Sequence, residues 1–182
     1  GTDKKNITNT LKNIDIKVFN DIVSSLSNVD KIYVLGLRSA APLAWFLSHY
    51  LSYIFDDVIT VNTLNSNILE TISRIKSNDA LIGISFPRYS TRTLESMRFV
   101  KSRGATVIGI TDGPLSPLHE ASRLCLDAET DMSSFVDSMA APMALVNALL
   151  VALGNKNQER LSKHFKYLEE IWEQHRVYTE QE

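Results

Sequence analysis

Residues 80–93 read Ala80-Leu81-Ile82-Gly83-Ile84-Ser85-Phe86-Pro87-Arg88-Tyr89-Ser90-Thr91-Arg92-Thr93. The first five residues are apolar and do not alternate with polar ones, which is typical of a strand covered on both faces. A loop rich in hydroxyl side chains follows, and Leu94, Met97 and Val100 then continue at helical spacing. The stretch therefore predicts a buried strand, a polar loop and a helix, in that order.

The same order recurs along the chain. Further short apolar runs lie at residues 31–35, 58–61, 106–110 and 123–126. The segments between the runs carry apolar residues at helical spacing, at residues 41–53, 68–76 and 94–103. Strands that alternate with helices in this way form βαβ units and a parallel sheet. The sequence therefore predicts an α/β fold, an open three-layer αβα sandwich with a five-stranded parallel sheet.

Both ends of the chain add predicted helices. Two apolar stripes precede the first strand: Ile7, Leu11 and Ile14, then Phe19, Ile22, Val23 and Leu26. Asp15 is placed to cap the second of these helices. After the last strand, an apolar helix is expected from Phe135 to a C-cap at Gly154. A final amphipathic helix carries Leu161, Phe165, Leu168 and Trp172.

These stripes have two interpretations. Packing into the core of one domain is the simpler interpretation. A dimer formed through the helices is the alternative, because the helix from Phe135 to Gly154 is so apolar that one small sheet domain covers it poorly.

Length and composition limit the class of protein. The chain has 182 residues, 44% of them hydrophobic, so it is long enough for one domain with a sizeable core and is not generally disordered. It carries 19 Lys+Arg against 21 Asp+Glu, a net charge of −2. Binding to nucleic acid or a membrane surface by clustered basic residues is therefore not expected of these residues.

The sequence also suggests a compartment. One cysteine, Cys125, excludes an internal disulfide framework and fits a reducing environment, so we expect a cytoplasmic protein. The longest apolar-rich run, residues 139–153, is shorter than the ~20 residues of a spanning helix, and we expect no membrane segment. The first residue is Gly1 rather than Met, as expected of a fragment of a longer protein.

Ligands of open parallel sheets bind beyond the carboxyl ends of the strands, so the loops after the strands are the candidate sites. The loop after residues 31–35 contains Ser39, and residues 85–93 contain Ser85, Ser90, Thr93 and the cation Arg88. A helix start offers unpaired N–H groups, and hydroxyls donate to phosphate oxygens, so this chemistry favours an anion. The alternative is that Ser39 and Ser90 act only as N-caps.

Other motifs fail on inspection. Gly36-x-Arg38-x-x-Ala41 lacks the later glycines of a dinucleotide-binding turn, and no Gly-Lys-Ser/Thr of a phosphate-binding loop occurs. Gly83-x-Ser85-x-Pro87 has proline where a nucleophile elbow has glycine. The histidines lack metal-ligand spacing with one another or with Cys125, so no metal site is predicted.

Three stretches together resemble the SIS (sugar isomerase) domain: residues 34–39, residues 83–93 and residues 104–118. Within that family they look most like the C-terminal phosphosugar-binding domain of RpiR-family transcriptional regulators. The resemblance covers residues 30–154, with residues 1–29 as a helical connector and residues 155–182 as a C-terminal helix that packs on the domain or on a dimer partner. Where many SIS domains have Ser-x-Ser-Gly, this chain has Pro87 and Arg88 at the second serine and the glycine.

The resemblance implies a ligand and a set of site residues. Ser39, Ser85 and Ser90 would cradle the phosphate of a phosphorylated sugar or amino sugar, with Thr93 and Arg88 nearby. It implies no cofactor, a homodimer or higher homo-oligomer, and DNA binding only through an N-terminal helix-turn-helix domain absent from this chain.

Sensor and enzyme are both open. An isomerase needs a base beside the sugar, and Glu129, Asp131, Glu70 and His119 are the candidates. None forms a recognisable catalytic pair, so no catalytic residue is assigned and the sensor is favoured. A sugar-phosphate (aldose–ketose) isomerase is the alternative, and a module for another anion or with a purely structural role is the third hypothesis.

Overall fold

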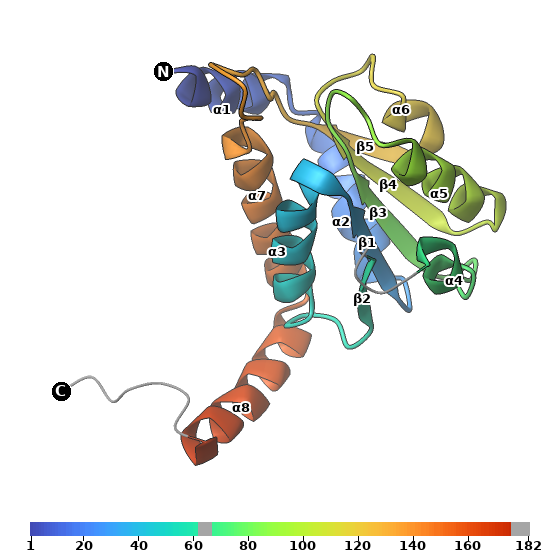
Figure 1. The fold of residues 1–182 in the computed structure, drawn as a ribbon. Helices are drawn as coiled ribbons and strands as arrows, with labels where there is room; N and C mark the ends of the chain where they lie inside the picture. The colour runs from blue at the N-terminus through green and yellow to red at the C-terminus, as the bar shows by residue number, and fades with distance from the viewer. Residues whose placement is uncertain (62–66, 176–182) are drawn as a thin grey trace.

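A single parallel sheet forms the centre of the molecule in the computed structural model, which describes residues 1–61 and 67–175. The strand order is β2-β1-β3-β4-β5, and every neighbouring pair is parallel (Figure 1). The strands are β1 (Ile32–Gly36), β2 (Val58–Val61), β3 (Ala80–Ile84), β4 (Thr106–Thr111) and β5 (Leu124–Asp127). The predicted five-stranded parallel sheet is confirmed.

Helices cover both faces of the sheet. The helices of the described residues are α1 (Thr2–Asn13), α2 (Ile16–Ser27), the short 3-10 helix η1 (Arg38–Ala40), α3 (Ala41–Leu51), α4 (Ile68–Ile72), α5 (Thr91–Ser102), α6 (Leu118–Ala121), α7 (Ala140–Lys156) and α8 (Gln158–His175). Helices α2, α3 and α7 lie on one face, and α4, α5 and α6 lie on the other (Figure 1). The predicted αβα sandwich is therefore confirmed.

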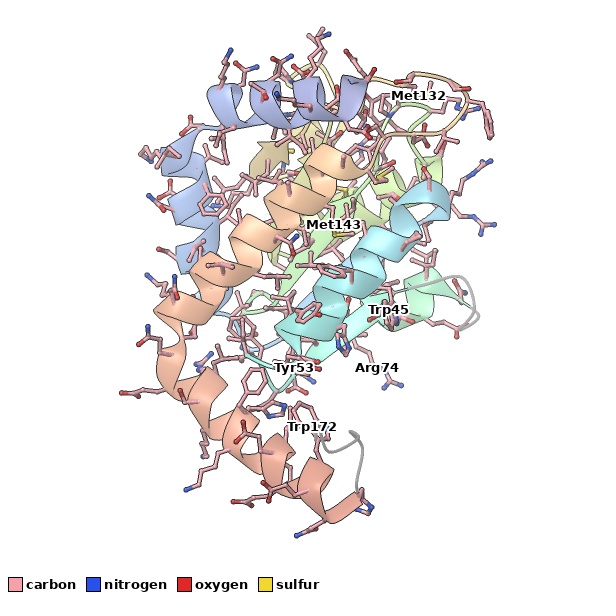
Figure 2. The ribbon with its side chains drawn as sticks, turned by 90° about the vertical axis from the view of Figure 1, so that its left-hand side faces the viewer. Trp45, Tyr53, Arg74, Met132, Met143 and Trp172 are labelled. Atoms are coloured by element: carbon pink, nitrogen blue, oxygen red, sulfur yellow. The ribbon has the colours of Figure 1, made fainter. Side chains whose placement is uncertain are left out.

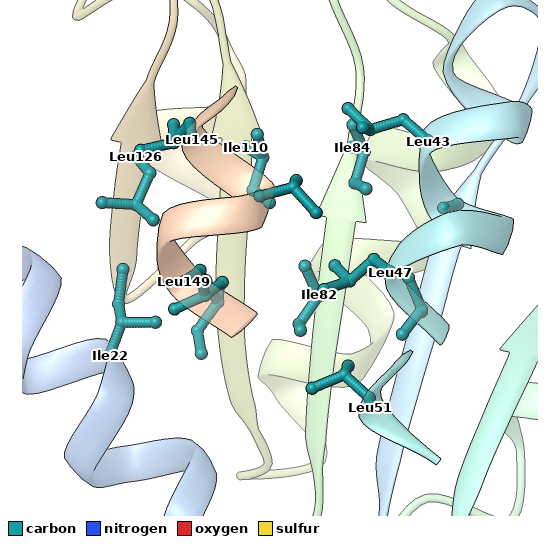
Figure 3. Packing of buried hydrophobic residues seen from close by; sticks show 14 of the residues in the cluster. Ile22, Leu43, Leu47, Leu51, Ile82, Ile84, Ile110, Leu126, Leu145 and Leu149 are labelled. Carbon is teal, nitrogen blue, oxygen red and sulfur yellow. The ribbon is translucent and has the colours of Figure 1, made fainter. Parts of the chain in front are cut away.

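The alternation of side chains along each strand divides the core in two. On β3, Ile82 and Ile84 point toward α3 and α7, where they pack with leucines such as Leu47 and Leu149 (Figure 3). Leu81 points to the opposite face and packs in the cluster beneath α4 and α5. Both faces are apolar, which is why the strands appear in the sequence as continuous apolar runs.

Local signals fixed several helix starts. The Asp15 carboxylate accepts a hydrogen bond from the Val18 N–H at 3.0 Å, so the predicted cap of α2 is confirmed. The end helices differ more from expectation. Helix α7 begins at Ala140, and Phe135 lies in the preceding loop with 88% of its surface exposed.

The predicted C-cap at Gly154 is wrong. Helix α7 continues to Lys156, and Gly154 is buried inside it. An added Cβ at Gly154 would lie 3.3 Å from Leu161 Cδ2, so this glycine allows close packing between α7 and α8. The predicted boundary between residues 154 and 155 therefore falls inside α7, and residues 176–182 of the predicted C-terminal segment lie outside the described residues.

The predicted core packing of the first apolar stripe is wrong for Ile7 and Leu11, whereas Ile14 packs against the core. Ile7 is 40% exposed and Leu11 is 73% exposed, whereas the buried residues of α1 are the polar Asn6 and Thr10. Helix α1 lies against the loop between β5 and α7, and that loop offers it polar partners.

Helix α8 extends away from the sheet (Figure 2). Its first half reaches the domain, because the Phe165 ring lies 5.3 Å from that of Tyr53 and Arg160 lies over Phe55. None of its residues is buried. Among the helices of residues 1–61 and 67–175, none combines the length and apolar character needed to cross a membrane.

Candidate phosphosugar site

A hollow lies at the carboxyl ends of β1 and β3. From β1 the chain turns to β2 on one side, and it returns to β3 on the other, so the loops after β1 and β3 diverge. Such a switch point is where open parallel sheets bind ligands. The hollow is small, with a volume of about 90 Å³. Its lining residues are Leu37, Arg38, Ser39, Ala40, Ser85, Phe86, Pro87, Arg88, Ser90 and Asp137.

Two serines after β3 line this hollow with their hydrogen bonds already arranged. The Ser90 N–H donates to Ser85 Oγ at 3.1 Å. The Thr93 N–H donates to Ser90 Oγ at 3.3 Å, so Ser90 is the N-cap of α5. A hydroxyl that accepts a bond still has its own proton to donate. Ser85 and Ser90 therefore keep donors for a ligand oxygen.

Ser39 joins the hollow from the other loop. It lies in η1 with its side chain exposed, and the N-cap of α3 is Ala40, so the interpretation of Ser39 as an N-cap is wrong. Gly36 lets this turn sit close to β1. A Cβ at Gly36 would lie 2.7 Å from both the Ala40 carbonyl oxygen and Ala44 Cβ.

Two arginines in the lining adopt an unusual backbone conformation. Arg38 has φ 57° and Arg88 has φ 63°, and within residues 1–61 and 67–175 they are the non-glycine residues with positive φ. Such conformations cost on the order of 1 kcal/mol each and cluster at active sites and ligand clamps. Both side chains are exposed, so the two cations flank the serine hydroxyls.

Thr93 differs from the other predicted ligand residues. Its side chain is fully buried, and its Oγ1 has no hydrogen-bond partner in the described part of the chain. The structure thus brings Ser39, Ser85, Arg88 and Ser90 to one hollow and leaves the buried Thr93 outside its lining.

A tyrosine ties the loop after β3 to the loop after β4. Tyr89 Oη donates to Asp112 Oδ1 at 2.8 Å, and Thr111 Oγ1 donates to the same oxygen at 3.1 Å. Burial and the hydrogen bond to Asp112 raise the pKa of Tyr89, so the phenol stays a donor at neutral pH. This bond fixes the backbone that carries Arg88 and Ser90.

A second hollow adjoins the first and shares Pro87, Arg88 and Asp137 with it. Its other lining residues are Asp112, Glu129, Thr130, Asp131 and Met132. Carboxylates therefore dominate this side, whereas hydroxyls and arginines dominate the first hollow.

The family follows from the sequence. The family model of the SIS domain matches residues 25–152, which is most of the chain. The chain belongs to the SIS domain family. The predicted family is confirmed, and the αβα architecture is that of this domain.

Relatives of this SIS domain include regulators. An uncharacterized HTH-type transcriptional regulator of Haemophilus influenzae is 26% identical over 111 residues, which cover 61% of this chain. The match covers only 38% of that relative's length, so the chain spans well under half of it.

Solved structures show the same fold. The sugar isomerase domain of an RpiR transcription factor from Sphaerobacter thermophilus has a TM-score of 0.88 at 24% identity, over 93% of this chain and 94% of that one. The NanR protein of Vibrio vulnificus in complex with ManNAc-6P has a TM-score of 0.81 at 19% identity, over 93% of this chain and 65% of that one.

The four candidate bases for isomerisation lie in different places in this SIS domain. Glu129 and Asp131 line the second hollow. Glu70 lies on α4 beside a different hollow, with Arg74 and Asp79. His119 Nε2 lies 2.8 Å from Asp127 Oδ1, outside both ligand hollows.

His119, Cys125 and Asp127 form a group that residue spacing did not predict. Their ligand atoms lie within 4.8 Å of one another, and a zinc-type ion accepts all three donor types. Burial and the Asp127 charge raise the pKa of the Cys125 thiol to about 12, so the thiol is not a nucleophile at neutral pH.

Sequence reasoning missed Arg38 and Asp137 as lining residues. The positive φ of Arg38 leaves no mark in the residue type, since glycine or asparagine is usual there. Asp137 reaches the hollow from the loop before α7, and no local pattern indicates that approach.

Proposed function

We propose that this SIS domain binds a phosphorylated sugar or amino sugar as the effector of an RpiR-type transcriptional regulator. The observation that supports this most strongly is the shared hollow: hydroxyls of Ser39, Ser85 and Ser90 converge with Arg38 and Arg88 where two strands diverge. The relative named as an HTH-type regulator favours a sensor over an enzyme.

The phosphate occupies the first hollow. Ser85 and Ser90 donate hydroxyl protons, and the first turn of α5 adds the positive end of the helix dipole. Arg38 and Arg88 supply the charge that hydroxyls lack. No metal ion or phosphate-binding lysine is required for such a cradle.

The sugar occupies the second hollow. Carboxylates of Asp112, Glu129, Asp131 and Asp137 accept hydrogen bonds from hydroxyl or ammonium groups. A sugar phosphate with a carboxylate of its own, such as a muramic-type phosphate, would meet like charges there. Neutral hexose phosphates and amino-sugar phosphates are therefore the favoured ligands.

Output and assembly complete the proposal. Residues 1–29 serve as the connector to a helix-turn-helix domain, and DNA is bound only through that domain. The chain forms a homodimer or higher homo-oligomer, for which α8 offers a half-exposed apolar stripe at Leu161, Phe165 and Leu168. Light scattering coupled to size-exclusion chromatography tests this part, and a monomer at high micromolar concentration contradicts it.

Isomerisation is the second candidate function. Glu129 lines the same hollow as Arg88, so a carboxylate lies where an isomerase would need a base. The two functions differ in one observable, because a sensor leaves its ligand unchanged.

The experiment is a thermal-shift panel of hexose, amino-sugar and muramic-type phosphates, with product analysis of every ligand that binds. A ligand specific for the folded state stabilises the chain by about 2.7 kcal/mol at a hundredfold excess over Kd. Ser85→Ala should reduce the shift. Ser102→Ala, at the far end of α5, is the matched control and should not.

Two outcomes contradict the proposal. Interconversion of the ligand establishes the isomerase. A shift that Ser85→Ala and Ser39→Ala both leave intact places the ligand elsewhere.

A further inference from the structure

The loop between β5 and α7 contacts two places at once. Glu129 and Asp131 line the second hollow. The same two residues bond helix α1: Asn9 Nδ2 donates to Glu129 Oε2 at 2.8 Å, and Asn6 Nδ2 donates to the Asp131 carbonyl oxygen at 2.9 Å. Lys5 Nζ lies 3.3 Å from Asp131 Oδ2. Two carboxylates therefore stand between the hollow and α1.

Further bonds extend this contact along the loop. The Glu129 N–H donates to Thr10 Oγ1 at 2.9 Å. Ser133 Oγ bonds Thr2 Oγ1 at 2.6 Å, and Ser138 Oγ donates to Asp3 Oδ1 at 2.7 Å. Ser138 follows Asp137, which lines both hollows. The loop thus binds α1 at both of its ends.

The contact depends on polar groups. Asn6 is fully buried and Thr10 is 8% exposed, whereas Ile7 and Leu11 point to solvent. A buried amide that loses its partner costs about 1–3 kcal/mol. Helix α1 also lies against α7, so the hydrogen bonds of the loop are one of two contacts that hold α1 in place.

We propose that residues 128–139 couple the second hollow to α1. When a sugar binds in the second hollow, the contact between this loop and α1 loosens. The inference rests on the proposed function and concerns its regulation. Hydroxyl groups of the ligand draw the Glu129 and Asp131 carboxylates toward the hollow and away from Asn9 and Lys5. Helix α1 is part of the connector of residues 1–29. Its release therefore changes the orientation of the helix-turn-helix domain that the connector carries.

Linkage makes the coupling reciprocal. If the ligand loosens α1, then loosening α1 by mutation must favour the ligand. Lys5→Ala with Asn9→Ala removes both side chains that compete for the carboxylates. Thr8→Ala is the matched control, because Thr8 lies on the exposed side of the same helix and its hydroxyl bonds the Lys4 carbonyl oxygen of its own helix.

The test is hydrogen–deuterium exchange of the full chain with ManNAc-6P, and with inorganic phosphate as a probe of the first hollow alone. Slower exchange at residues 90–94 reports binding. With ManNAc-6P bound, residues 2–13 should exchange at least about threefold faster, and phosphate alone should have no such effect. Unchanged or slower exchange in α1, with residues 90–94 protected, overturns the inference and leaves the proposed function standing.

A second measurement needs no ligand. In the Lys5→Ala/Asn9→Ala variant, residues 128–139 should exchange faster than in the wild type, whereas Thr8→Ala should match the wild type. If the double variant leaves the exchange of residues 128–139 unchanged, the loop and α1 are not coupled, and the inference fails whether or not a sugar phosphate binds.

Discussion

The two hollows of this SIS domain are built in different ways. The first is held by short-range contacts: Ser85 bonds a residue five positions away, and Ser90 bonds one three positions away. The second is lined by a loop whose hydrogen bonds reach residues 119 to 135 positions away, on α1. The serines of the first hollow are therefore held within their own loop, whereas the lining loop of the second depends on a distant helix.

The difference suggests a division of labour. A phosphate common to many ligands needs the same geometry each time, and local bonds provide it. A sensor must also differ in affinity between two states, and that requires a movable part. The β5–α7 loop has that character, because its contact with α1 consists of polar bonds that side chains can exchange.

The largest expected effect concerns the turn after β1, which lines the first hollow. Gly36→Ala should lower the free energy of unfolding by about 2 kcal/mol, because the new Cβ would overlap the Ala40 carbonyl oxygen and Ala44. Gly113→Ala is the control, since its Cβ meets no atom within 4 Å. Urea unfolding measures both. Equal stabilities would show that the turn after β1 is not rigid.

The next prediction separates the backbone strain at Arg88 from the role of its side chain in sugar-phosphate binding. Arg88→Gly should raise stability by up to about 1 kcal/mol, because glycine tolerates φ 63°. It should weaken sugar-phosphate binding about tenfold through loss of the cation. Arg98→Gly, in the middle of α5 and outside its first turn, should instead destabilise and leave affinity unchanged. If Arg88→Gly binds as tightly as the wild type, Arg88 is not a ligand.

A third prediction concerns β5, the strand that leads into the β5–α7 loop. Burial and the Asp127 charge raise the pKa of Cys125 from 9.0 to about 12, so the folded chain holds a proton that the unfolded chain loses. The contribution of this thiol to stability should be constant well below pH 9 and should fall between pH 9 and 12, by about 1.4 kcal/mol per pH unit.

Urea unfolding at pH 8 and pH 10 checks this sign. The wild type should lose about 1.4 kcal/mol more than Cys125→Ala between these values. The comparison with the variant removes the contribution of tyrosines and lysines that titrate in the same range. Identical losses would mean that the thiol is not held protonated by the fold.

The smallest expected effect lies where the two regions meet. Asp137→Asn removes a negative charge from the lining of both hollows, so affinity for inorganic phosphate should rise about two- to threefold at low salt. Asp56→Asn, an exposed residue beyond α3, should change nothing. Calorimetric titration at two ionic strengths measures it, and a fall in affinity would contradict the placement of the phosphate in the first hollow.

The sequence allowed prediction of whatever depends on neighbouring residues. The strands could be predicted because both of their faces are buried. Asp15 and Ser90 could be predicted as caps because a cap bonds an N–H three residues ahead. The meeting of Ser39 with Ser85 followed from the rule for parallel sheets together with the family resemblance.

The features that could not be predicted depend on residues far away in the sequence. The polar side of α1 is buried because the β5–α7 loop supplies hydrogen bonds to Asn6 and Thr10, and an apolar stripe at Ile7 and Leu11 pointed to the opposite face. The extension of α7 past Gly154 reflects contact with Leu161 rather than the propensity of glycine to end helices. Tertiary contact decided these positions against local preference.

A crystal structure of the chain with ManNAc-6P tests the central claim most directly. We expect the phosphate oxygens within hydrogen-bond distance of the Ser39, Ser85 and Ser90 hydroxyls, and the sugar hydroxyls beside Glu129 and Asp131. A bound sugar phosphate that leaves the hollow between Ser39 and Ser85 empty would contradict it.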